Sequence, residues 1–153
     1  MLTPAVLWVD PGEVTGLARL EVHRGMFKAD EFRDAVAWDH IESYCRMQGS
    51  ALSIGWERYT ITSATHKLTS QPAALETIGV CRYLARSHHC RILQPAQQHT
   101  PNSLDQDRLR KLGWWVPGKD DAQSAAAHLL NWLLREHELP PRERQLLGLS
   151  GRC

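Results

Sequence analysis

The residues best placed for chemistry are acids that stand where apolar segments begin or end. Asp10 directly follows the apolar run 5–9, and Glu57 ends a second apolar run. Asp120 and Asp121 open a segment in which apolar residues recur with helical spacing. A carboxylate at the end of a buried run is costly unless it is paired or binds a cation. These acids are therefore candidates for a shared metal site.

Each acid also has an ordinary structural explanation. Asp10 begins an Asp-Pro-Gly sequence that is typical of a turn, and Glu57 could be a solvated strand end. Asp120 or Asp121 could cap a helix or interact with its dipole. These explanations would have to hold independently on three separate elements, and for that reason we favour a joint role.

A joint role points to a particular class of metal. Carboxylates that converge without histidine or cysteine favour a hard cation, Mg²⁺ or Mn²⁺, over Zn²⁺. Two such ions per site suit the hydrolysis of phosphodiester bonds, because one activates a water molecule and the other stabilises the leaving oxygen. We therefore treat these positions as candidate catalytic residues and metal ligands, namely Asp10, Glu57, Asp120 and Asp121.

The elements that would carry these acids follow from hydrophobic periodicity. The first three predicted strands are joined by short connections, which indicates antiparallel hairpins, and the rest of the chain alternates between strand and helix. This order is typical of the α/β class, with a mixed five-stranded sheet and helices on both faces. The predicted strands are 5–9, 15–22, 25–32, 51–57 and 90–93, and the predicted helices are 35–47, 72–87, 103–112 and 120–137.

Length and composition set limits on the organisation of the chain. Its 153 residues are enough for one domain with a real core, which we assign to residues 1–137. Residues 138–153 contain neighbouring prolines and several charges, and we expect a loosely packed C-terminal tail there. The net charge of +1 argues neither for nor against a nucleic-acid partner.

The cellular setting is also predicted from composition. The four cysteines have no metal-ligand spacing, so we expect free thiols in a reducing compartment. Neither a secretory signal nor an apolar stretch of membrane-spanning length is visible in the sequence. We therefore expect a cytoplasmic protein without a membrane partner.

The segments around the acids resemble those of RuvC-type Holliday-junction resolvases, which belong to the RNase H-like superfamily. Residues 9–16 resemble the opening motif of that family, an Asp-Pro-Gly turn followed by Thr-Gly. Residues 54–57 resemble its second acidic motif, and residues 119–128 resemble the acidic start of its last helix. The resemblance runs from about residue 4 to residue 135 and preserves the order and approximate spacing of the motifs.

This resemblance implies an RNase H-like fold and a two-metal endodeoxyribonuclease that cuts Holliday junctions or other branched DNA. It also implies a homodimer, with the helix that starts near Pro72 in the interface, because a resolvase cuts two strands symmetrically. The Gly-Trp-Trp sequence before the last helix is similar to RuvC-like proteins of bacteriophages. The implied setting is the cytoplasm of a bacterium or of a phage-infected host.

One position departs from the family pattern. RuvC resolvases commonly carry two acids three residues apart on the last helix, and here Asp121 matches the first while Ser124 matches the second. A serine hydroxyl offers an oxygen but no negative charge. Either another acid, such as Asp120, completes the site, or the activity is reduced.

Contacts with DNA are predicted on both sides of the site. Arg58, Tyr59 and Lys67 belong to the segment after Glu57, where basic groups suit phosphates and an aromatic ring can stack on an unpaired base. Lys111 belongs to a second basic group in the helix 103–112. The alternatives are an ordinary polar loop and a solvated helix face.

Two other functions remain open at this stage. The same metal chemistry would serve an RNase H-like nuclease that acts on flaps or on RNA–DNA hybrids. A protein of the same fold could also be a catalytically weak DNA-binding protein, because Ser124 replaces an acid of the family. His128 lies on the same side of its helix as Asp121, and we expect it to be a packing residue rather than a ligand.

Overall fold

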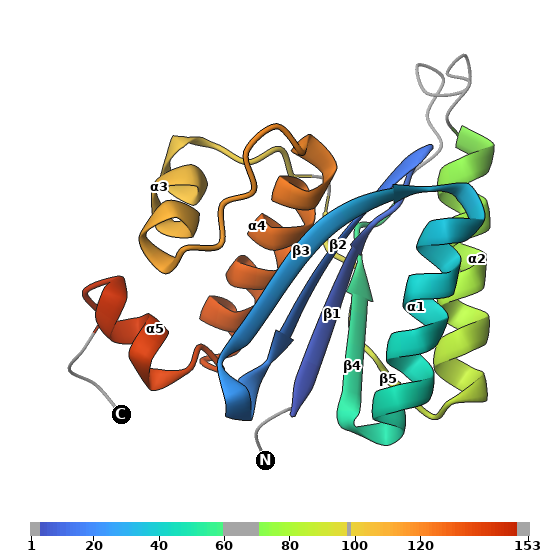
Figure 1. Ribbon diagram of the computed structural model, residues 1–153, viewed down its shortest axis with the longest axis horizontal. Helices are drawn as coiled ribbons and strands as arrows, with labels where there is room; N and C mark the ends of the chain where they lie inside the picture. Colours follow the sequence, from blue (N-terminus) through green and yellow to red (C-terminus); the bar gives the residue numbers. More distant parts are fainter. Residues whose placement is uncertain (1–3, 60–70, 98, 150–153) are drawn as a thin grey trace.

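The computed structural model describes residues 4–59, 71–97 and 99–149. Its strands are β1 (Ala5–Asp10), β2 (Val14–Glu21), β3 (Met26–Arg33), β4 (Leu52–Trp56) and β5 (Arg91–Ile92). They form one sheet in the order β3-β2-β1-β4-β5 (Figure 1). β1, β2 and β3 are antiparallel hairpin partners, and β4 and β5 continue the sheet in parallel beyond β1. The predicted mixed five-stranded sheet is confirmed.

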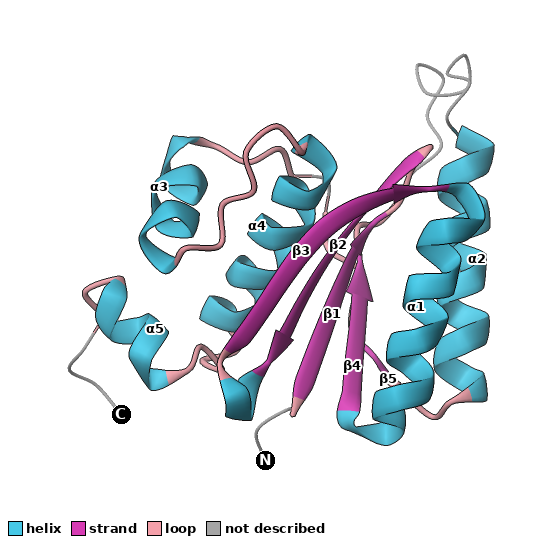
Figure 2. Cartoon of the chain, viewed as in Figure 1, coloured by secondary structure: helices cyan, strands magenta, loops and turns pink. Residues whose placement is uncertain are grey.

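Helices cover both faces of the sheet, as predicted. α1 (Asp34–Gln48) and α2 (Gln71–Ser87) lie on one face, and α4 (Asp120–Arg135) lies on the other (Figures 1 and 2). α3 (Ser103–Leu112) packs against α4, and α5 (Pro141–Leu146) contacts α3. Single-turn 3-10 helices, η1 (Val22–Arg24) and η2 (Gly49–Ala51), connect β2 to β3 and α1 to β4.

β1 lies at the centre of two hydrophobic layers. Residues 5–9 are fully buried, with Val6 and Trp8 in the layer under α4 and Leu7 in the layer under α1 and α2. A strand that is covered on both faces is apolar at every position rather than at alternate ones. This explains why the sequence shows a continuous apolar run before Asp10.

The prediction of a loosely packed tail is wrong for residues 139–146. Leu139 is 4 % exposed and joins the core cluster under α4, and Glu143 is 5 % exposed. Pro141 occupies the first turn of α5, where proline is well tolerated because its missing N–H has no helical partner. The neighbouring prolines that suggested an irregular tail instead start a short helix.

The described cysteines and helices bear on two smaller expectations. Cys45, Cys81 and Cys90 are buried free thiols, as predicted, and Cys153 lies outside the described residues. No helix within the described ranges has both the length and the apolar character that crossing a bilayer requires.

Candidate active site

Two of the candidate acids reach one edge of the sheet because two parallel strands end there side by side. Asp10 is the last residue of β1, and Glu57 directly follows β4. Val9 lies opposite Trp56 in the parallel register, so the acids occupy the next position on neighbouring strands. Adjacent strands are roughly 4.8 Å apart, which places both carboxyl groups at the same edge.

A third acid approaches this edge because Gly16 has no side chain. Gly16 pairs with Asp10 across the β1–β2 ladder. A Cβ atom at Gly16 would lie 1.9 Å from the carbonyl oxygen of Asp121. The first turn of α4 therefore rests directly on the backbone of β2, and Asp121 lies near enough to Asp10 to act on its charge.

The electrostatics of Asp10 reflect this crowding. Burial, together with the neighbouring charges of Glu57 and Asp121, raises the pKa of Asp10 to about 8. Burial, with the charges of Glu31 and Asp120, also raises the pKa of Asp121. Acidic groups that repel one another and are partly shielded from solvent are stabilised by a proton or by a cation.

Ser124, the position that departs from the family pattern, also belongs to this group. Its hydroxyl forms a hydrogen bond with Asp10, which opposes the rise in the pKa of that carboxyl group. Ser124 follows Asp121 by three residues and therefore lies on the same side of α4. A neutral oxygen thus stands beside Asp10 at the position where the resemblance leads us to expect a carboxylate.

The two acids at the start of α4 differ in their surroundings. Asp120 is exposed, and its charge raises the pKa of Asp121 but is not among the causes that shift the pKa of Asp10. The backbone N–H groups of Asp121 and Ala122 donate to Glu31 Oε2, at 3.1 and 3.4 Å. Glu31, which pairs with Gly16 in the β2–β3 register, is not among the acids predicted from the sequence. The sequence of β3 gives no signal that Glu31 belongs to the site, because the backbone groups that it binds lie on α4.

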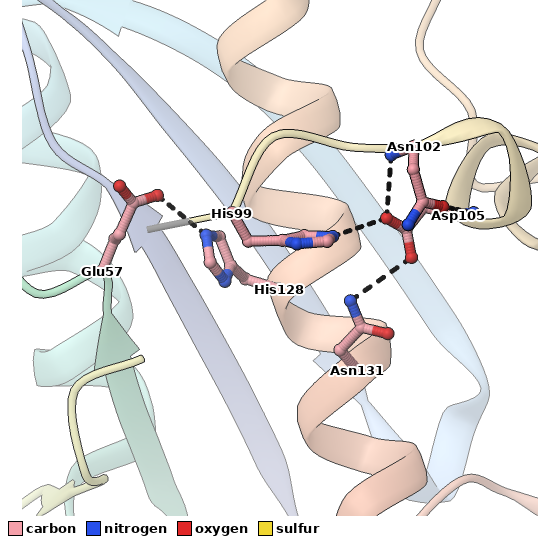
Figure 3. Close-up of polar contacts among 6 residues, drawn as sticks. All are labelled: Glu57, His99, Asn102, Asp105, His128 and Asn131. Carbon is pink, nitrogen blue, oxygen red and sulfur yellow. Dashed lines mark hydrogen bonds and ion pairs between the residues drawn. The ribbon is translucent and has the colours of Figure 1, made fainter. Parts of the chain in front are cut away.

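Glu57 is held by His128. The Nε2 atom of His128 and the Oε2 atom of Glu57 are 2.8 Å apart (Figure 3). The His128 ring is 4 % exposed and stacks on Trp8, with ring centroids 5.7 Å apart. Packing, the role expected for His128, is therefore only part of what this residue does, since it also contacts a candidate catalytic acid.

A second histidine, His99, lies beside His128 and is held by a different acid, Asp105. The rings of His99 and His128 meet edge to face, with centroids 6.0 Å apart. His99 Nε2 lies 2.6 Å from Asp105 Oδ2, and the same buried carboxyl group accepts from the backbone N–H of Asn102 at 3.0 Å (Figure 3). Asn131 Nδ2 donates to the other oxygen of Asp105 at 3.4 Å. Asp105 thus ties the segment before α3 to α4.

The donor chemistry of the site fits Mg²⁺ or Mn²⁺. Asp10, Glu57 and Asp121 offer only carboxylate oxygens, and the burial and mutual repulsion of these groups favour a bound cation. As the side chains lie, no three acidic, histidine or cysteine groups in the described part of the chain converge into a coordination shell. Glu57 is instead turned to His128.

The predicted DNA contacts have different outcomes. Arg58 and Tyr59 line a cleft of about 330 Å³ between β4 and α2, next to Glu57. Lys111 forms an exposed ion pair with Asp107, at 3.0 Å, which agrees with the alternative of a solvated helix face. Lys67 lies outside the described residues.

Comparisons with known proteins support the fold. No protein-family model and no curated protein sequence matches the chain. The solved structure of T. thermophilus RuvC in complex with a Holliday junction substrate is similar, with a TM-score of 0.54 and 12 % identity. That match covers 88 % of this chain and 97 % of RuvC. A simian T-cell lymphotropic virus intasome in complex with PP2A regulatory subunit B56 gamma matches with a TM-score of 0.36 and 10 % identity, over 83 % of this chain and 48 % of that one. The chain has the fold of RuvC, which is the fold implied by the motifs.

Proposed function

We propose that this protein is a metal-dependent endonuclease that cuts Holliday junctions or other branched DNA. The observation that carries the proposal is the meeting of Asp10, Glu57 and Asp121, from β1, the end of β4 and α4, at one edge of the sheet. The similar fold of RuvC, which was solved with a Holliday junction, favours branched DNA as the substrate.

Each residue has a distinct task in this proposal. Asp10, Glu57 and Asp121 would hold two Mg²⁺ or Mn²⁺ ions, which supply an activated water and a positive charge at the leaving oxygen. His128 keeps the Glu57 carboxylate oriented through the contact of 2.8 Å. Ser124 orients the Asp10 carboxyl group through its hydrogen bond. Glu31 holds the first turn of α4 on β2 and so fixes where Asp121 lies.

The test is cleavage of labelled four-way junctions, flaps, RNA–DNA hybrids and linear duplexes with Mg²⁺, with Mn²⁺ and with EDTA. We expect metal-dependent cuts in the junction and none in the duplex. Asp10→Asn should abolish cleavage while DNA binding persists, whereas the matched variant Asp39→Asn, at an exposed position of α1, should cleave normally. Preferred cleavage of flaps or hybrids would support the other nuclease function.

A catalytically weak DNA-binding protein is the second candidate. Ser124 favours it, because the site has one negative charge fewer than the family pattern. Junction binding without cleavage in either metal would support this candidate. A bound ion should raise the melting temperature of the native protein more than that of Asp10→Asn. If neither Mg²⁺ nor Mn²⁺ caused this larger rise, the metal site itself would be ruled out.

A homodimer through α2 belongs to the same proposal. Leu75 and Tyr83 are exposed by 43 % and 70 %, and their spacing of eight residues places them on one outer face of α2. Exposed apolar groups of this kind are typical of contact surfaces. We expect a dimer by light scattering, and a monomer after Tyr83→Arg.

A further inference from the structure

A cleft lies next to the candidate active site, and of its lining residues only His128 has a task in the proposed chemistry. Its volume is about 880 Å³, and it is lined by β5, by the segment that follows β5 and by the second half of α4. His128 lines this cleft. It also contacts Glu57 (Figure 3), so the cleft adjoins the candidate acids. Clefts of roughly 300–1,000 Å³ suit ligands of the size of a nucleotide.

The polar groups of this cleft fall into two classes. His99 and Asn131 are already held by the buried Asp105. Gln94 and Gln97 have no hydrogen-bond partner within the described part of the chain, although both line the cleft. The first class has a fixed position, whereas the second has donors and acceptors available for a ligand.

The charge of the cleft is suited to a single phosphate. Arg135 Nε and Glu136 Oε1 lie 3.6 Å apart, so the charges of these two residues largely cancel. Arg91, on β5, forms no ion pair in the described residues. It therefore remains as an uncompensated cation at the cleft, and a guanidinium group suits the forked geometry of a phosphate.

We propose that this cleft binds one unpaired nucleotide of the DNA strand, next to the phosphate that is cleaved. Gln94 and Gln97 have amide groups, which can form paired hydrogen bonds with the edge of a base. The His99 ring can stack on the face of that base, because Asp105 fixes its position. Arg91 binds the adjoining phosphate. The placement of the cleaved phosphate beside this cleft depends on the proposed nuclease function.

The proposal gives a physical reason for acting on branched DNA. Taking a base out of an intact duplex costs unpairing and unstacking energy, and this cost is smallest where pairing is already interrupted. A cleft for an unpaired nucleotide beside the acids therefore selects substrates with a branch, a gap or a flap. Four-way junctions that open at the branch point meet this requirement.

The experiment uses Asp10→Asn protein, so that the DNA stays intact, and junctions with 2-aminopurine at one position at a time around the branch. Binding should raise the fluorescence at one or two adjacent positions, because neighbouring bases quench 2-aminopurine and the cleft separates it from them. Combining Gln94→Ala with Gln97→Ala should remove this rise and weaken binding by about 5- to 100-fold. Arg91→Gln should weaken binding and lower the slope of log affinity against log salt by about one.

The matched controls are Gln48→Ala and Arg24→Gln, at the end of α1 and in η1, near the end of the sheet away from Asp10. Both should retain the fluorescence rise and the affinity. Cleavage by the native protein without any fluorescence rise would overturn the cleft proposal and leave the nuclease intact. A rise that depends on Gln94 and Gln97, with no cleavage by the native protein in either metal, would support the cleft and overturn the nuclease.

Discussion

Glu57 Oε2 and His128 Nε2 lie 2.8 Å apart, which joins the end of β4 to a residue two turns into α4. The ring of His128 is itself fixed, because it stacks on the fully buried Trp8. The direction of the Glu57 carboxyl group is therefore set by residues of three elements. Groups that orient a metal ligand in this way commonly change metal affinity or activity when they are replaced.

The first prediction concerns this contact. His128→Phe keeps a ring against Trp8 but removes the hydrogen bond to Glu57. We expect cleavage to require more Mg²⁺, with activity or metal affinity reduced about 10- to 100-fold. Metal titrations of the cleavage rate check this. His40→Phe is the matched control, because His40 also stacks on an aromatic ring, that of Phe32, and is not among the groups that shift the pKa of Asp10 or Asp121. Lower thermal stability with an unchanged metal requirement would show that His128 only packs.

The second prediction concerns the close approach of α4 to β2. Gly16→Ala would place a Cβ atom 1.9 Å from a backbone carbonyl oxygen, so α4 must move. We expect the free energy of unfolding to fall by roughly 3 kcal/mol or more, and cleavage to be lost. Urea denaturation gives the first value. Gly79→Ala, on an open part of α2, should instead stabilise the protein by up to about 1 kcal/mol.

The third prediction separates the acids at the start of α4. Asp121→Asn should reduce cleavage severely, because Asp121 acts on Asp10, and the exposed Asp120→Asn should have a milder effect. Single-turnover cleavage rates of the two variants decide the question. A silent Asp121→Asn with an inactive Asp120→Asn would mean that Asp120 is the ligand.

The fourth prediction adds the acid that the family pattern would have at Ser124. Ser124→Asp places a further carboxyl group beside Asp10 and removes the hydroxyl that now bonds to it. Without metal, we expect a lower melting temperature because like charges repel. With metal, we expect cleavage to be preserved or raised at low Mg²⁺ concentration. An unchanged melting temperature in EDTA would place the new carboxyl group away from Asp10.

The fifth prediction is a pH dependence at Asp105. Burial acts to raise the pKa of Asp105, but hydrogen bonds from Asn102, His99 and Asn131 outweigh it and lower the pKa. A lowered pKa in the folded state stabilises the fold above the ordinary pKa of about 4, and the effect is lost as the pH falls through the folded value. Asp105→Asn should therefore cost about 2 kcal/mol at pH 7 and progressively less below pH 4.

Urea denaturation at several pH values measures this cost. Asp107→Asn is the matched control on the same helix, and it should change stability by a few tenths of a kcal/mol because its ion pair with Lys111 is exposed. A cost at Asp105 that stays constant down to pH 3 would contradict the prediction.

The sequence by itself determined the five strands, the helices α1 to α4 and the positions of Asp10 and Glu57 at the strand ends. Hydrophobic periodicity depends on local burial, and an acid that ends an apolar run is visible without any long-range information. The prolines and charges of residues 138–153 predicted a loosely packed tail, because the burial of Leu139 depends on contacts with distant residues that the local sequence does not show.

Only the tertiary structure decided which further groups meet these acids. Asp121 rather than Asp120 lies by Asp10 because α4 rests on Gly16, and the rotation of a helix at such a contact cannot be derived from its own periodicity. Glu31 and the first turn of α4 are 90 residues apart in the chain, and Glu57 and His128 are 71 apart. Contacts of that range depend on strand register and helix packing, and these are settled only when the whole core is assembled.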